Sequence, residues 1–340
     1  MNHVPGNQRI LFVHNGRTSF IETDLTLLSE IFDVTELYES SKSGLRPIGI
    51  WHEVQGHDLV FCWFASWHSF FPVLFARLQG KPALLVTGGY DTARVPEASY
   101  GSQRGGLKKW VSRAVIRFAN GVITNSNSAR KEAIGNARAK RERITVIHHG
   151  LEFQFGEPNL RKDRMVLTVG NVWRENFLRK GLKPFIKAAR AFPEVSFVHA
   201  GKWRDDSIQS LRDIAPPNVT FLGFVSDDEL HSLYDRASVY VQASLHEGFG
   251  ISVAEAMLSG CLPVVYPSGS LPEVVGDAGI VTEHCTVEDL VIAIRAGLDA
   301  GESQRSYCRE HIMSNFPMDD RRKKLHALVL EVLNTQMKDK

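Results

Sequence analysis

The sequence predicts an α/β protein built from two doubly wound, Rossmann-like domains that face a central cleft. Short apolar runs alternate with helical patterns along most of the 340 residues, and this alternation is typical of parallel sheets buried on both faces. The alternation is interrupted at Gly150–Arg164, where Gly, Pro and charge occur without periodicity, and this stretch is predicted to be an interdomain linker. The length is sufficient for two domains.

Each series of apolar runs supplies the strands of one sheet. The first series comprises Arg9–His14, Asp58–Trp63, Ala83–Thr87, Gly121–Thr124 and Ile144–His148. The second comprises Met165–Gly170, Val195–Ala200, Val219–Leu222, Val239–Gln242, Leu262–Tyr266 and Gly279–Val281. Stretches between them, such as Thr23–Ile31 and Ser69–Leu78, are predicted helices. We therefore expect domains at residues 1–157 and 158–317, with a C-terminal helix at 318–337 that packs back on the first.

Composition narrows the class of protein. Hydrophobic residues make up 43% and charged residues 23% of the chain, as in globular proteins that bury a large core. Forty Lys and Arg against 38 Asp and Glu predict no nucleic-acid partner. The four cysteines form no CxxC pair, which favours a reduced, cytoplasmic compartment over zinc or disulfides. The apolar runs are too short for a signal peptide or a membrane helix, so we expect a soluble or peripheral protein.

The segment HEGFGISVAE, His246–Glu255, carries the clearest functional signal. It follows a predicted strand, and its two glycines precede a helical run that begins at Ile251. A Gly-x-Gly turn at this point lets backbone N–H groups approach an anion at the helix N-terminus, and a diphosphate fits such a site. Glu247 lies in the turn, where it can reach a sugar hydroxyl, and Glu255 lies a turn inside the helix, where it can accept hydrogen bonds from a ribose. Spacing alone also fits a tight turn with two solvated carboxylates.

The same segment resembles the E-x7-E signature of retaining GT-B glycosyltransferases, in particular family GT4. The resemblance runs through HEGFGISVAEAMLSGCLPVV into SGSLPEVVGDAGIV, which ends at Val281. Weaker matches stand in the expected order: VITNSNSARKEAI, VIHHGLE, MVLTVGN with RKGLKPFIKAAR, and FLGFVSDDELHSLYDRASVYV. The resemblance implies an acceptor-side domain at 1–157 and a nucleotide-sugar donor domain at 158–317.

The resemblance also implies roles for individual residues of the second domain. Glu255 would bind the ribose, Glu247 the donor sugar, and Lys180 the diphosphate. The backbone of Gly248, Phe249, Gly250 and Ile251 would hold the diphosphate, and Gly223, Phe224 and Val225 would meet the base.

One position departs from the family pattern. The family has an Arg just after the first strand of the donor domain, where this chain has Asn171. Arg174 or Arg179 is the candidate replacement, and for Arg179 a solvated charge at a helix start is the alternative.

The first domain offers fewer signals. The family's His-x-His is absent, but SerTrpHis resembles a variant of it, which makes His68 a candidate contact to the donor sugar or a structural histidine at a helix start. Asp91 follows a Gly-Gly turn and is predicted either to orient an acceptor hydroxyl or to cap the turn. Asn15 and Gly16 follow the first strand and are candidates for the phosphate side of the cleft.

A basic amphipathic helix is predicted at Gly105–Phe118. Between Ala98 and His148 the chain has eleven Lys and Arg and two acidic residues, Glu132 and Glu142, which indicates an anionic surface or ligand nearby. The helix suits docking to anionic lipid headgroups, and an ordinary solvated helix is the alternative.

The sequence thus predicts a metal-independent retaining transferase without a cofactor. It would move a hexose from a UDP- or GDP-sugar to a glycan or lipid-linked acceptor, in polysaccharide or glycolipid synthesis at the cytoplasmic membrane face. The chain lacks the Asp-x-Asp pair with which transferases of the other main fold hold a metal, so Lys and Arg would stabilise the departing diphosphate. A nucleotide-sugar epimerase of the same fold and a degenerate nucleotide-sugar-binding protein remain alternatives. A nicotinamide dehydrogenase is disfavoured because no Gly-x-Gly-x-x-Gly follows the first strand.

Overall fold

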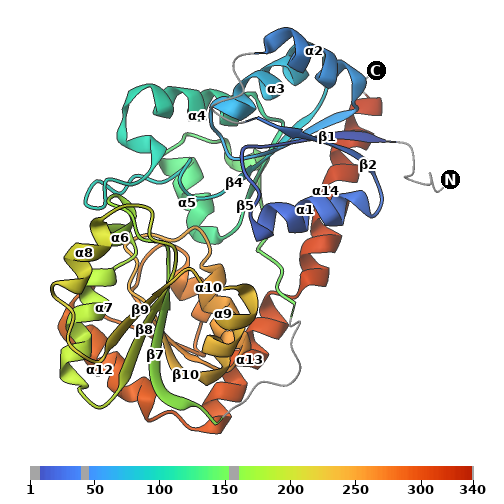
Figure 1. Cartoon of the computed structure of the whole chain (residues 1–340). Helices are drawn as coiled ribbons and strands as arrows, with labels where there is room; N and C mark the ends of the chain where they lie inside the picture. The colour runs from blue at the N-terminus through green and yellow to red at the C-terminus, as the bar shows by residue number, and fades with distance from the viewer. Residues whose placement is uncertain (1–7, 40–45, 153–160, 339–340) are drawn as a thin grey trace. The chain divides into compact units, whose positions relative to one another are not determined.

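A computed structural model describes residues 8–39, 46–152 and 161–338 and divides the chain into two compact units (Figure 1). Residues Met1–Arg94, Gly101–Gly150 and Met318–Lys340 form the first unit; Val95–Tyr100 and Leu151–Pro317 form the second. Each contains a six-stranded parallel sheet, so the prediction of two doubly wound α/β domains is confirmed. Residues 153–160 of the predicted linker, which include the expected boundary at 157, lie outside the described residues.

The sheet of the first unit has the strand order β2-β1-β3-β4-β5-β6. Its strands are β1 Arg9–His14, β2 Asp33–Tyr38, β3 Leu59–Trp63, β4 Ala83–Thr87, β5 Gly121–Thr124 and β6 Ile144–Val146. Its helices are α1 Ser19–Ser29, α2 Pro47–Gly56, α3 Trp67–Leu78, α4 Gly106–Phe118, α5 Asn127–Gly135 and α14 Met318–Lys338, with short 3₁₀ turns η1 Ser102–Arg104 and η2 Arg141–Arg143.

Helices cover both faces of this sheet because successive strand residues point to opposite sides. One face packs on α2, α3, α4 and α5. The other packs on α1 and α14, where Leu325, Val329 and Leu333 of α14 enter the core. The guanidinium of Arg321 donates to both carboxylate oxygens of Asp24 in α1, at 2.7 and 2.8 Å, and both side chains are buried. This ion pair fixes the C-terminal helix on the first unit.

The sheet of the second unit has the order β12-β11-β10-β7-β8-β9. Its strands are β7 Asp163–Val169, β8 Ser196–Ala200, β9 Val219–Gly223, β10 Ala237–Gln242, β11 Leu262–Val265 and β12 Ile280–Val281. Its helices are α6 Asn176–Arg179, α7 Leu182–Ala188, α8 Ser207–Arg212, α9 Asp227–Arg236, α10 Ile251–Leu258, α11 Leu271–Val275, α12 Val287–Leu298 and α13 Glu302–Asn315, with a 3₁₀ turn η3 Ala189–Ala191. One face packs on α9, α10, α11 and α13 and the other on α7, α8 and α12.

The eleven predicted strands all occur, and their ends differ from the prediction by at most two residues. The sequence reading missed β2 and α2. Strand β2 pairs only with β1 within the sheet and has no fully buried residue, so its sequence DVTELY lacks the apolar run that identified the others. Helix α2 buries only Ile50 and Val54. Among the described residues, no helix is long and apolar enough to cross a membrane.

Candidate functional site

Each sheet reverses its strand order at one point, and polar residues follow the strands there. In the second unit the reversal lies between β7 and β10, and in the first between β1 and β3. Crossovers leave in opposite directions from such a point, which opens a crevice outside the carboxyl ends of the two strands. The segments to consider are therefore those after β7 and β10, and those after β1 and β3.

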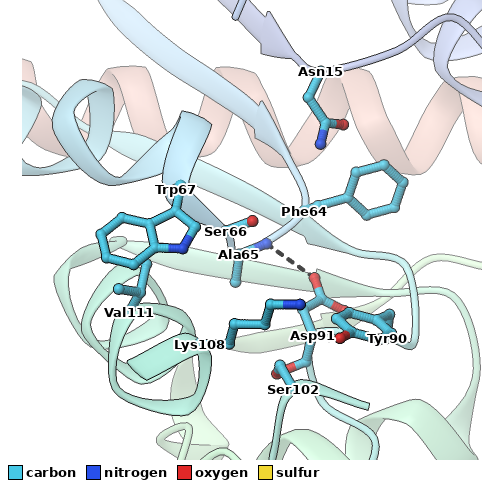
Figure 2. A pocket seen from close by; sticks show the side chains of 10 residues that line it. All are labelled: Asn15, Phe64, Ala65, Ser66, Trp67, Tyr90, Asp91, Ser102, Lys108 and Val111. Atoms are coloured by element: carbon cyan, nitrogen blue, oxygen red, sulfur yellow. Dashed lines mark hydrogen bonds between the residues drawn. The ribbon is translucent and has the colours of Figure 1, made fainter. Parts of the chain in front are cut away.

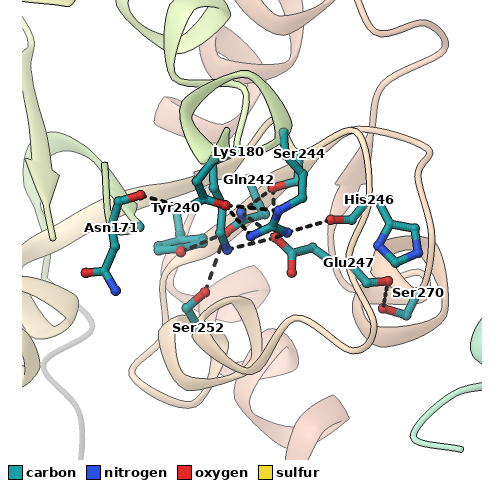
Figure 3. A network of polar contacts seen from close by, with 12 residues as sticks. Asn171, Lys180, Tyr240, Gln242, Ser244, His246, Glu247, Ser252 and Ser270 are labelled. Carbon is teal, nitrogen blue, oxygen red and sulfur yellow. Dashed lines mark hydrogen bonds and ion pairs between the residues drawn. The ribbon is translucent and has the colours of Figure 1, made fainter. Parts of the chain in front are cut away.

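Glu247, five residues beyond β10, is the centre of a polar cluster (Figure 3). One carboxylate oxygen, Oε1, accepts hydrogen bonds from four side chains: Lys180 at 2.8 Å, Ser244 at 2.9 Å, and Arg179 and Gln242 at 3.2 Å each. The backbone carbonyl of Glu247 accepts from the Ser270 hydroxyl at 3.0 Å. The carboxylate is therefore fixed through Oε1. No residue that the structure describes donates to Oε2, which can accept a hydrogen bond from a ligand.

The Glu247 carboxylate stays ionised near neutral pH. Burial raises the pKa of Glu247, but the charges of Lys180 and Arg179 outweigh it and lower that pKa to about 2. Burial lowers the pKa of Lys180, and Glu247 opposes this effect. Because the side chains of Lys180 and Glu247 are only 15% and 12% exposed, their ion pair is shielded from water. A third charge, Arg179, leaves this cluster with a net positive charge for an anionic ligand.

Arg179 holds the loop that carries Glu247. Its guanidinium also donates to the carbonyl of His246 at 2.9 Å and to Asn176 Oδ1 at 2.7 and 3.0 Å. The alternative of a solvated charge at a helix start is wrong, since Arg179 is 9% exposed.

A glycine lets the Arg179–Lys180 segment approach β10. Gly181 has φ +65°, and a Cβ there would lie 1.7 Å from the carbonyl oxygen of Ala243. The amide of Leu245 donates to the Arg179 carbonyl at 2.8 Å. Lys180 in turn lies against Gly170 at the end of β7. The RKG sequence therefore joins the two strands at the reversal point.

Glu255 lies inside α10 in a different environment. Burial raises its pKa to about 7, and a hydrogen bond from the Tyr234 hydroxyl at 3.2 Å opposes the shift. No Lys or Arg forms an ion pair with it among the described residues. The two glutamates thus differ: Glu247 is a fixed anion, whereas Glu255 is poised between its charged and neutral forms at neutral pH.

The turn between them has the geometry expected of an anion-binding helix start. Gly250 is the N-cap of α10 with φ +98°, and Ile251 is the first helical residue. Gly248 is half-buried. Phe249 is 4% exposed and its ring packs on Phe316, so it can offer a ligand only its backbone.

The remaining predicted residues of this unit lie after β7 and β9. Asn171 Oδ1 accepts a hydrogen bond from the Lys202 backbone amide at 2.9 Å, so this side chain holds the loop that follows β8. Arg174 donates its backbone N–H to Asp205 at 2.8 Å, and its side chain is exposed. Gly223 has φ +76°.

Two aromatic side chains stand near Gly223. Phe224 is 67% exposed, and the Lys202 ammonium lies 4.3 Å from its ring centroid. Trp203 is the nearest side chain to a Cβ built at Gly223. Val225, next to Phe224, is half-buried. An exposed aromatic ring beside a left-handed glycine is a suitable platform for a planar base.

The first unit has a cavity of about 350 Å³ at its own reversal point (Figure 2). It is lined by Asn15 after β1, by Phe64, Ala65, Ser66 and Trp67 after β3, and by Tyr90, Asp91, Ser102, Lys108 and Val111. Trp67 and Tyr90 are 52% and 40% exposed. Aromatic faces and an ammonium around such a cavity suit a saccharide.

Asp91 lines this cavity, but backbone groups already occupy its carboxylate. One oxygen accepts from the amides of Gly88 and Gly89, both at 3.1 Å, and the other from Ala65 at 3.0 Å. Burial raises its pKa to about 6, and these amides oppose the shift. The geometry favours the turn-capping alternative, in which Asp91 joins the loops after β3 and β4.

His68 and Gly16 do not line the cavity. A ring nitrogen of His68, Nε2, lies 2.7 Å from the Trp63 carbonyl and so donates to it, and burial lowers the His68 pKa to about 4. His68 is therefore neutral and tied to backbone, as the structural alternative expects. The carbonyl of Gly16 accepts from His14 at 2.8 Å, and nothing lies within 4 Å of a Cβ at Gly16.

Sequence reasoning missed the polar partners of the two glutamates: Gln242, Ser244, Ser270 and Tyr234. Gln242 and Ser244 share one strand end with Glu247, so their spacing before it was the available signal. Tyr234 comes from α9, and only the fold brings it to Glu255.

Solved structures define the class to which this fold belongs. A crystal structure of Anabaena HepE in complex with UDP and glucose matches 95% of this chain and 100% of its own, with a TM-score of 0.72 and 19% identity. The sucrose-phosphate synthase of Thermosynechococcus elongatus matches 96% of this chain and 100% of its own, with a TM-score of 0.76 and 16% identity. Both sheets and their order place the chain in the GT-B fold class.

Sequence comparison gives the family. The model of glycosyl transferases group 1 matches residues 152–311, and that of glycosyltransferase family 4 matches residues 40–155. The chain belongs to glycosyltransferase family 4. The O-antigen chain mannosyltransferase B of Escherichia coli is 42% identical over 88 residues, which are 25% of this chain and 23% of that protein. The chain spans less than two thirds of the length of the first curated relatives that it matches.

Proposed function

We propose that the protein is a retaining, metal-independent glycosyltransferase that uses a nucleotide diphosphate sugar. The observation that carries this proposal is the cluster of Lys180, Arg179 and Glu247 beside the N-terminus of α10. Lys180 and the helix start would stabilise the charge on the departing diphosphate. Oε2 of Glu247 would accept a hydrogen bond from a hydroxyl of the donor sugar. The Glu255 carboxylate would accept hydrogen bonds from the ribose hydroxyls.

The donor and acceptor classes are part of the proposal. The donor would be a UDP- or GDP-hexose, with the base on the backbone of Gly223–Val225 and the ring of Phe224. The acceptor would be a glycan or lipid-linked saccharide in the cavity between Trp67 and Tyr90. Such acceptors belong to cell-surface polysaccharide or glycolipid synthesis, which would place the enzyme at the cytoplasmic face of the membrane, with α4 as the contact.

Arg179, Asp91 and His68 receive positioning roles in this proposal. Arg179 holds the Glu247 loop, so we assign the phosphate contact to Lys180 rather than to Arg174 or Arg179. Asp91 and His68 hold the loops around the acceptor cavity through backbone hydrogen bonds.

A thermal-shift screen of UDP, GDP and ADP with their hexose conjugates tests the donor. A ligand that binds the folded protein stabilises it, so we expect one nucleotide series to raise the melting temperature without added metal. If calorimetry detects no binding of any nucleotide diphosphate, a protein with a degenerate donor site is favoured instead. NMR of the stabilising sugar nucleotide incubated without acceptor distinguishes an epimerase, which would produce the epimer.

A further inference from the structure

The first unit has a second cavity, of about 320 Å³, which the proposed reaction does not use. Five cations line it: Arg113 and Arg117 of α4, Arg138 and Lys140 of the turn after α5, and Arg143 of η2. Its remaining lining is apolar or small: Trp110, Ala114, Ile116, Val122, Ala137 and Ala139. Val122 lies near the amino end of β5, whereas the acceptor cavity follows the carboxyl ends of β1 and β3. The two cavities are therefore separate sites.

The cations of this cavity lack acidic partners. Among the described residues, no carboxylate forms an ion pair with any of the five, and the side chains of Arg117, Arg138 and Lys140 make no hydrogen bond. Burial and the charge of Arg138 lower the pKa of Arg113. Like charges gathered without counter-charge raise the free energy of the free protein, and a bound anion relieves that cost.

The cavity is also partly prebuilt. Arg113 is held by Gln103 Oε1 at 3.0 Å and by the Asn136 carbonyl. Arg143 donates to the Arg117 and Ala119 carbonyls at 3.4 and 3.3 Å at the end of α4. Arg138 has φ +61°, a left-handed conformation that costs about 1 kcal/mol or more for a residue with a side chain. Two of the five charges, those of Arg113 and Arg143, are thus fixed by hydrogen bonds.

An exposed apolar strip adjoins the cations. Leu107 and Trp110, 65% and 66% exposed, lie one turn apart on α4, in line with Ala114 and Arg117. Apolar side chains beside Arg on one helix are the pattern of helices that lie in a membrane interface, where Trp favours the headgroup level. A soluble anion would need the cations but not this strip.

We propose that this cavity binds the headgroup phosphate of an anionic phospholipid, with Leu107 and Trp110 inserted between neighbouring lipids. The proposal extends the membrane contact of α4 to a defined site and does not depend on glycosyl transfer. Its test measures no catalysis, so it can fail while the proposed function holds, and the reverse.

The test is sedimentation of the full chain with phosphatidylcholine vesicles, with and without one third phosphatidylglycerol. We expect binding to the anionic vesicles alone, weakened by salt. Arg117→Gln and Arg138→Gly should each lower the partition coefficient about five-fold. Arg138→Gly also relieves the left-handed backbone, and a melting temperature near that of the wild type separates its loss of binding from unfolding. Trp110→Ala should lower it as well.

The matched control is Lys323→Gln, which removes an exposed charge from α14 in the same unit and should leave the partition unchanged. Equal losses for Lys323→Gln and Arg138→Gly would overturn the site, because net charge alone would then explain binding. Calorimetry with glycerol phosphate identifies the source of the phosphate. If glycerol phosphate binds in an Arg138-dependent manner while the anionic vesicles do not, the cavity takes a soluble anion and the lipid assignment is wrong.

Discussion

Glu255 combines a structural cost with the binding role that we propose for it. Its folded pKa of about 7 lies above the usual value of 4.5, so the folded protein binds more protons than the unfolded chain between these values. Stability from this group is present below about pH 4.5 and is lost as pH rises to 7. We predict that Glu255→Gln raises the free energy of unfolding by about 1–2 kcal/mol at pH 8. Chemical denaturation at pH 8 and pH 5 measures it, and no gain at pH 8 would contradict the prediction.

The same pKa predicts how donor binding depends on pH. A ribose diol donates hydrogen bonds, so it prefers the ionised form of Glu255. Affinity for a nucleotide sugar should fall about tenfold from pH 8 to pH 6. Calorimetry with the sugar conjugate measures this, because its phosphates do not titrate in that range. In Glu255→Gln the affinity should be weak and independent of pH. If the variant kept the pH profile of the wild type, the assignment of the ribose contact to Glu255 would be wrong.

Lys180 should affect turnover, while Arg179 still pairs with Glu247 when Lys180 is replaced. In the proposed reaction the departing diphosphate would lose a fixed cation without the Lys180 charge, so Lys180→Met should lower kcat about 10²- to 10³-fold. Lys187→Met removes an exposed charge from α7 nearby and is the control, with activity near wild type. Lys180→Arg keeps the ion pair with Glu247 and should restore part of kcat. A Lys180→Met enzyme with normal kcat would place the diphosphate elsewhere.

At the scale of elements, Gly181 decides whether β7 and β10 can be joined by the RKG segment. Gly181→Ala would add a Cβ in contact with the Ala243 carbonyl and force a left-handed alanine. We predict a loss of about 2 kcal/mol or more in stability, with weaker donor binding as Arg179 and Lys180 shift. Gly135→Ala at the end of α5, where nothing lies within 4 Å, should be neutral. Thermal unfolding of both variants decides the point.

Elements also show how far the sequence could predict this molecule. Continuous apolar runs predicted the buried strands, and the two glycines predicted the turn at Gly248–Gly250. Strand β2 has no such run, because an edge strand needs few apolar residues. The contacts of Asp91, His68 and Arg179 could not be predicted either. Asp91 and Arg179 depend on backbone groups far away in the sequence, Ala65 for Asp91 and His246 for Arg179. His68 depends on the Trp63 carbonyl, five residues earlier, and this contact is set by the conformation of the turn after β3.

At the scale of the whole molecule, the two units have separate cores and should respond separately. Arg321→Met would leave Asp24 buried without its partner and should cost the first unit about 3–5 kcal/mol. Calorimetry should show a lower melting temperature for the first unit. The melting temperature of the second unit should still rise when the nucleotide is added. The double variant Asp24→Asn with Arg321→Met should recover part of the loss. A single transition lowered together with the nucleotide response would mean that the units unfold as one.

The ion pair between Asp24 and Arg321 spans 297 residues of sequence, and this separation sets an order of events on the ribosome. Apart from Val95–Tyr100, the second unit is continuous from Leu151 to Pro317, so it can fold while the last helix is still being translated. The first unit, although synthesised earlier, must wait with part of one face of its sheet uncovered until Leu325, Val329 and Leu333 arrive, since α1 covers only the rest of that face. A premature stop near residue 318 would therefore release a chain whose early half stays prone to aggregation and whose later half is folded.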